Sequence, residues 1–290
     1  MGTEIKVNNH DNSVIPKGIV ESKLRASQYQ MDIIAILLAE IGKTTDIEEN
    51  LEYTLTAETF AAVKHIADVH EAARILREYI CGSKKTNDES MRHIGFEVMI
   101  DNTEFRHFNW FEKIYYIDGT ATFYLTSEIK KFLVDFKKND PYKIYAKLRY
   151  ILPMRSRYSK RIYLMCREFI GSGERFCDND WSLFKEKLQI PSTYNYYMIK
   201  KNVLQTAKDE INELTDIEID FTVKDKKKKG GTEPESIQFT IKKKANYDDV
   251  DLDKVTEKET VDDFSSLSDY EMMQTIQKMQ EILKNRHKDV

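Results

Sequence analysis

The chain has 290 residues, of which 41% are hydrophobic and 32% charged, and its formal net charge is −4. This composition predicts a folded protein of about two domains and excludes a largely disordered chain. No run of eighteen apolar residues occurs, and the first residues lack the apolar core of a signal peptide, so we expect neither a membrane span nor export. Three widely spaced cysteines indicate a reducing cytoplasm without structural disulfides.

Charge is distributed unevenly along the chain. Residues 1–140 carry 17 basic and 23 acidic side chains, residues 141–244 carry 22 and 14, and residues 245–290 carry 6 and 12. A basic segment between two acidic ones is typical of a protein that binds a polyanion, because neutralised phosphates supply most non-specific affinity. We therefore expect residues 141–244 to be the main DNA reader.

The first half of the chain predicts a domain at 17–140, preceded by a disordered N-terminal arm at 1–16. A helix at 27–42 precedes the strand-like "LEYTL", and two short helices follow, capped by Thr56 and Asp68. A β-rich stretch with turn residues completes this domain. Its second short helix offers Arg74 and Arg77 as DNA contacts, but the domain is acidic overall. It would make fewer phosphate contacts, or its sheet would serve a protein interface.

The same order of elements recurs further on. "SQYQMDIIAILLAEIG" at 27–42 and "SRYSKRIYLMCREFIG" at 156–171 share five identities at a constant offset. The second copy belongs to a domain predicted at 141–244. We also count four basic residues at the start of its first helix as DNA contacts: Arg155, Arg157, Lys160 and Arg161.

Two helices in the second domain have the spacing of a helix-turn-helix. "NDWSLFKEKLQI" at 179–190 has Asp180 as its expected cap, and the helix at 193–214 repeats apolar residues every three or four positions with Thr193 as its expected cap. Polar groups gather in the N-terminal half, the part of a recognition helix that enters the major groove. The expected DNA contacts there are Thr193, Asn195, Tyr196, Lys200, Lys201 and Asn202. The choice among the tyrosines stays open, since some of them could be core.

A β-hairpin follows this helix directly. Residues 217–223 and 237–241 alternate apolar and polar side chains around a tip with Gly230 and Gly231. A helix-turn-helix followed by a hairpin predicts a winged helix, with a wing that contacts phosphates through Lys226, Lys227, Lys228 and Lys229. The alternative is a loop tip that is merely solvated. The fold class is thus α+β, with two winged-helix domains in tandem.

The last residues predict an acidic linker at 245–267 and an amphipathic helix at 268–290. The helix carries an apolar stripe at heptad-like spacing, formed by Met272, Ile276, Met279 and Leu283. The stripe would either dock on the second domain or bind a partner protein.

With this order in view, the chain resembles the iteron-binding plasmid replication initiators of bacteria. The resemblance is carried by "SRYSKRIYLMCREF", "YNYYMIKKNVLQTAKDEINELTDIEIDF" and "ESIQFTIKKK", and it spans residues 17–244. It implies a bacterial, cytoplasmic, plasmid-associated protein that binds direct repeats of double-stranded DNA at an origin and helps open A·T-rich DNA. It also implies recruitment of the host initiator and helicase, and autorepression as a dimer. The acidic first domain and residues 245–290 depart from the family pattern.

Other classes fit the sequence less well. The six histidines never form the closely spaced pair of a rolling-circle nuclease, and no phosphate-binding loop of an ATPase occurs. We therefore expect no catalytic residue, metal, cofactor, small-molecule substrate or membrane partner. A winged-helix transcriptional regulator without a role in replication is the alternative, and it would share the DNA-binding features.

Overall fold

The computed structural model describes residues 2–43, 52–82, 90–99, 105–139, 143–170, 175–225 and 234–244. Residues 1–244 form one unit, and residues 245–290 form a second unit that lies outside the described residues. The predicted acidic linker and the helix stripe of Met272, Ile276, Met279 and Leu283 therefore lie outside them too. So do the four wing lysines, Lys226 to Lys229.

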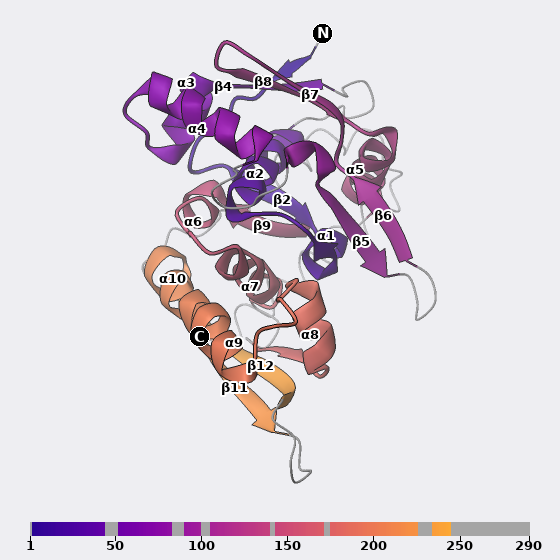
Figure 1. The fold of residues 1–290 in the computed structure, drawn as a ribbon, viewed down its shortest axis with the longest axis vertical. Coiled ribbons are helices and arrows are strands. Elements are labelled where there is room, and N and C mark those ends of the chain that lie inside the picture. The colour runs from indigo at the N-terminus through magenta and orange to yellow at the C-terminus, as the bar shows by residue number, and fades with distance from the viewer. Residues whose placement is uncertain are drawn as a thin grey trace, which may run out of the picture. The chain divides into compact units, whose positions relative to one another are not determined.

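The first winged helix follows the predicted order (Figure 1). Thr56 and Asp68 cap their helices as expected, since their side chains accept hydrogen bonds from the amides of Thr59 and His70. The hairpin turns at Asp118 and Gly119, which both have positive φ. Its elements are α2 (Gln28–Lys43), β4 (Glu52–Thr56), α3 (Ala57–Lys64), α4 (Val69–Cys81), β7 (Phe111–Ile117) and β8 (Thr120–Leu125).

The second winged helix repeats this order. It contains α7 (Arg157–Arg167), β10 (Arg175–Asp178), α8 (Trp181–Lys187), α9 (Tyr196–Ile199), a π-helical segment (Lys200–Gln205), α10 (Thr206–Leu214), β11 (Ile217–Asp225) and β12 (Pro234–Lys243). The hairpin pairs apolar residues with apolar residues, as in Ile219 with Ile241 and Phe221 with Phe239. Alternation therefore predicted both the strands and the buried face of this sheet.

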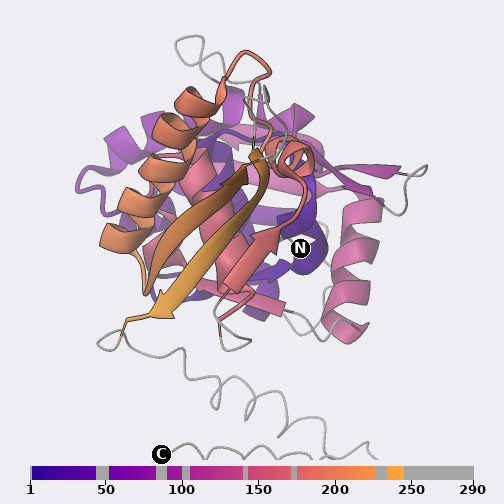
Figure 2. The same cartoon turned by 90° about the horizontal axis from the view of Figure 1, so that it is seen from below.

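The two sheets share one topology, which confirms the duplicated order. In the first sheet the strand order is β1-β4-β8-β7, and in the second it is β10-β12-β11. In each, the strand between the helices pairs with the second strand of the hairpin. Figure 2 shows the three strands of the second sheet side by side, with α10 along them. The repeated serines also act alike: Ser27 accepts a hydrogen bond from the amide of Gln30, and Ser156 from those of Tyr158 and Ser159.

The prediction of a disordered arm at 1–16 is wrong. Strand β1 (Thr3–Glu4) extends the first sheet, and β2 (Asn12–Pro16) pairs with β9 (Lys143–Lys147). Ile5 is 0% exposed and Ile15 is 3% exposed. The arm is ordered because β2 pairs with β9. These strands lie about 130 residues apart in sequence, and local periodicity cannot reveal such a pairing.

Smaller elements complete the described part of the chain. They are α1 (Lys17–Glu21), β3 (Lys23–Leu24), a 3₁₀ turn (Met91–His93), β5 (Gly95–Met99), β6 (Phe105–Asn109), α5 (Ser127–Asn139) and α6 (Leu148–Ile151). Helix α2 lies at the centre, with every residue from Gln30 to Ile41 buried. A helix that is buried on all sides needs partners for its polar groups. Asp32, in the second turn of α2, pairs with two lysines, Lys64 and Lys160.

Candidate nucleic-acid interface

The recognition helix of the second domain begins two residues later than predicted. Its cap is Asn195, whose side-chain oxygen accepts a hydrogen bond from the Met198 amide at 2.9 Å. The expected cap, Thr193, lies instead in a turn that the Tyr194 amide closes by donating to the Pro191 carbonyl at 3.0 Å. A short polar side chain at the cap satisfies an amide that the first helical turn leaves unpaired. Asn195 therefore fixes where the helix starts, and Thr193 stays exposed before it.

The outward face of this helix carries unpaired cations. Lys200, Lys201 and Asn202 are all exposed, between the buried side chains of Ile199 and Val203. Within the described part of the chain, neither Lys200 nor Lys201 forms an ion pair, whereas Lys208 further along binds Asp220 at 2.8 Å. Lysine and asparagine can donate hydrogen bonds to base edges and phosphates. The first half of the helix thus presents positive charge that no described carboxylate neutralises.

The structure separates the two neighbouring tyrosines. Tyr196 is half-buried and packs edge-on against Trp181, with ring centroids 5.9 Å apart. Tyr197 is 72% exposed, the largest exposed fraction among the described large apolar side chains. The sequence analysis counted Tyr196 among the contacts and left the choice among the tyrosines open; exposure favours Tyr197 instead. Its position four residues before Lys201, on the same side of a helix, was the pattern that could have identified it.

The prediction that Lys160 and Arg161 contact DNA is wrong, because both side chains are buried. Lys160 is 0% exposed; its ammonium pairs with Asp32 and donates to the Ile151 carbonyl at 2.7 Å. Arg161 is 4% exposed and donates to the carbonyls of Ile19, Val20 and Ser22 at 3.2, 2.9 and 2.5 Å. Neither side chain can reach DNA from these positions. Both join the start of α7 to the first domain.

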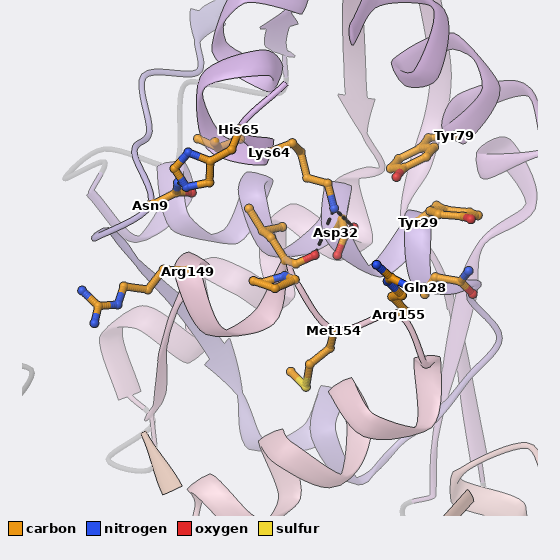
Figure 3. A pocket seen from close by; sticks show the side chains of 13 residues that line it. Asn9, Gln28, Tyr29, Asp32, Lys64, His65, Tyr79, Arg149, Met154 and Arg155 are labelled. Atoms are coloured by element: carbon orange, nitrogen blue, oxygen red, sulfur yellow. Dashed lines mark hydrogen bonds and ion pairs between the residues drawn. The ribbon is translucent and has the colours of Figure 1, made fainter. Parts of the chain in front are cut away.

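Burial changes the proton affinity of both cations. Desolvation lowers the pKa of Lys160, against the pull of the Asp32 carboxylate, and it lowers the pKa of Arg161 to about 10. Asp32 also binds Lys64 at 2.8 Å, a pair that Figure 3 shows. One buried carboxylate thus pairs with two lysines, Lys64 and Lys160. Asp32, Lys64 and Lys160 together form a buried ion cluster.

The remaining candidates, Arg155 and Arg157, lie at the start of α7 and reach the surface. Arg155 is exposed, and Arg157 is half-buried and donates to the hydroxyl of Tyr158 and the carbonyl of Gln189, both at 3.0 Å. Arg155 lies at a cavity of about 620 Å³ that also reaches Arg149, Lys64 and the contacting rings of Tyr29 and Tyr79, which are tilted by 30° (Figure 3). The cavity thus joins helices of the first domain to the segment that enters the second.

The first-domain helix α4 presents little free positive charge. Arg74 is exposed, but it binds Glu71 and Glu78 on its own helix, each at 2.6 Å. The hydrogen bonds that Arg74 donates to Glu71 raise the pKa of Arg74 and lower the pKa of Glu71. Arg77 is exposed on the same helix. The two domains therefore offer different surfaces: a partly neutralised helix in the first and unpaired lysines in the second.

The described residues contain no cluster of three or more His, Cys, Asp or Glu side chains placed to hold a metal. Cys166 is fully buried, and desolvation raises its pKa well above the usual thiol value. Among the described helices, none is both long and apolar enough to span a membrane.

Fold and helix surface together define a DNA-binding protein of the tandem winged-helix class. Two family models match: "Initiator Replication protein, WH1" over residues 15–167 and "Initiator Rep protein, WH2" over residues 180–241. The chain belongs to this family of initiator Rep proteins, and it is a replication initiator.

Comparison with known proteins adds support for the fold. No curated protein matches the chain. Among solved structures, the chain is similar to one described as "Crystal structure of Pi initiator protein in complex with iteron DNA". The TM-score is 0.63 at 18% identity, over 83% of this chain and 100% of that one. At this identity the likeness establishes the fold alone.

Proposed function

We propose that this initiator binds iterons, the direct repeats of a plasmid origin, chiefly through the recognition helix of its second domain. One observation carries the proposal: Lys200, Lys201 and Asn202 form an exposed run at the outward side of that helix, with no described acidic partner for the lysines. The similar Pi initiator was solved with iteron DNA, which supports direct repeats as the ligand. The exposed Arg155 and the wing lysines, Lys226 to Lys229, would add phosphate contacts.

The first domain is proposed to play a weaker electrostatic part. Arg74 is already paired with two glutamates, so a contact between Arg74 and a phosphate would require rearrangement of those pairs. Arg77 remains as a candidate phosphate contact. Most of the specific binding free energy would then come from the second domain. We infer this difference between the domains from the charge of α4 in the first domain and of the recognition helix in the second, which occupy equivalent places in the two winged helices.

Origin opening would use binding energy rather than chemistry. Contacts to phosphates and bases offset the cost of bending and unstacking adjacent A·T-rich DNA. We propose that the chain has no nuclease or ATPase activity and acts in the bacterial cytoplasm on plasmid DNA. The proposed protein also recruits the host initiator and helicase, and as a dimer it represses its own gene. Residues 245–290 are the proposed site for a host partner.

The experiment is a footprint on the DNA that flanks the gene. Purified protein is expected to protect tandem direct repeats spaced by about one or two helical turns. Protection of a single inverted repeat, with no direct repeats bound, would contradict the proposal and favour a transcriptional regulator. Supercoiled origin DNA incubated with the protein and Mg²⁺ is expected to remain unnicked, and tyrosine-dependent nicking would contradict the non-enzymatic part.

A further inference from the structure

The recognition helix contains a change of helical type at its centre. Helix α9 ends at Ile199, the segment Lys200–Gln205 is π-helical, and α10 begins at Thr206. The Thr206 hydroxyl donates to the carbonyl of Lys201, five residues earlier, at 3.2 Å. This is the carbonyl that an i→i+5 turn directs toward position 206. Thr206 therefore reinforces the π-helical segment from its downstream end.

The π-helical segment narrows the buried side of the helix. Ile199, Val203, Leu204, Ala207 and Ile211 are all 0% exposed. In a regular α-helix, at roughly 100° per residue, these five would spread over about 140°. A π turn holds about one residue more, which rotates the second half of the helix and reduces the spread to about 80°. The segment thus lets the whole helix dock on one narrow face.

The same rotation defines the opposite side. Directly across from the buried face lie Tyr197 and Lys201, one turn apart and both exposed. Tyr197 leaves 72% of its surface in solvent, while the neighbouring Tyr196 packs on Trp181. Among the described residues, no ring contact or hydrogen bond holds the Tyr197 side chain. A large, stiff, half-apolar ring at this position has no role in the core.

We propose that Tyr197 reads a thymine in the major groove, and that the π-helical segment, reinforced by Thr206, holds Tyr197 and Lys201 on the edge that enters the groove. The apolar ring matches the thymine C5-methyl group, which is the apolar mark of an A·T pair in that groove. Lys201 beside it matches guanine or a phosphate. Tyr197 is thus a specificity-determining residue, and Thr206 is a positioning residue. This inference rests on the proposed binding of direct repeats.

The test removes the thymine methyl and the ring separately. The probe is the direct repeat footprinted with wild-type protein, with each thymine replaced in turn by uracil. Wild type is expected to lose about fourfold in affinity at one thymine, the effect of a single methyl group. Tyr197→Ala should bind the unmodified repeat about fourfold or more weakly and should no longer distinguish uracil from thymine there. Tyr197→Phe should behave like wild type, and Tyr196→Ala, whatever its affinity, should keep the uracil sensitivity.

Thr206 is tested with variants of similar size. Thr206→Val, which lacks the hydroxyl, should lower the ratio of repeat affinity to random-sequence affinity without a change in thermal stability. Thr206→Ser, which keeps a hydroxyl, should have the wild-type ratio. A Tyr197→Ala protein that keeps the full uracil sensitivity would overturn the assignment of Tyr197. An equal loss on random DNA would make the ring a backbone contact and overturn it as well. If wild type itself failed to prefer the repeat, the proposed function would fail instead.

Discussion

The buried ion cluster gives the strongest prediction about stability. Asp32 is 2% exposed, and it is the carboxylate for both Lys160, which is 0% exposed, and Lys64. Asp32→Ala leaves the buried ammonium group of Lys160 and the partly buried one of Lys64 close together without a counter-charge. Removing one member of a buried pair costs about 3–5 kcal/mol. We expect the free energy of unfolding to fall by that amount.

The assay is urea denaturation followed by circular dichroism at pH 7, with a matched control. Asp220→Ala also removes an aspartate from a lysine, but the Asp220 side chain is 68% exposed. Its pair with Lys208 contributes about 0–1 kcal/mol. Asp32→Ala combined with Lys160→Met should recover part of the loss, because the charge that was left unpaired is removed. An Asp32→Ala protein as stable as Asp220→Ala would refute the claim that the cluster holds α2 and α7 together.

Three further predictions concern the wing, residues 245–290 and a buried tyrosine. Replacing Lys226 to Lys229 with serine should weaken binding to repeat and random DNA alike. The slope of log affinity against log salt concentration should become shallower by roughly 0.9 for each phosphate that the wing no longer neutralises. In gel shifts, weaker binding to the repeat alone would show that the wing reads bases. Deleting residues 245–290, which carry 6 basic and 12 acidic side chains, should leave repeat binding intact and impair plasmid maintenance. Normal plasmid maintenance would show that these residues are dispensable. An unfolded product would show that the predicted helix docks on the second domain. Burial raises the pKa of Tyr53 to about 12, so the folded state keeps a proton that the unfolded state loses above pH 10, and stability falls between pH 10 and 12. Tyr53→Phe should reduce that fall in urea melts without loss at pH 7, because the Tyr53 hydroxyl has no hydrogen-bond partner among the described residues; an unchanged pH dependence would contradict this.

Local patterns predicted the elements that local physics controls. The caps Thr56, Asp68 and Asp180 were read from their residue type and position. The hairpin of the second domain followed from its apolar alternation. Such features depend on neighbours within a few residues, and the sequence contains them directly.

Long-range contacts escaped prediction for a physical reason. Lys160 and Arg161 are typical surface residues by type, and their partners in the first domain, up to 142 residues away, help to make them interior. Strand β2 depends in the same way on β9. The π-helical segment has no simple sequence pattern. The four-residue spacing places Tyr197 and Lys201 on one side of a helix, but the 72% exposure of Tyr197 emerged only with the structure.

The central claim is that the second-domain helix recognises direct repeats. The most direct measurement compares Lys201→Ala with wild type in gel shifts on the footprinted repeat and on random DNA of equal length, at fixed salt. Lys208→Ala, on the same helix but bound to Asp220, is the control. We predict a loss of about 1–3 kcal/mol for Lys201→Ala on the repeat, with a smaller loss on random DNA, and little change for Lys208→Ala. Equal affinity of Lys201→Ala and wild type for the repeat would contradict the account.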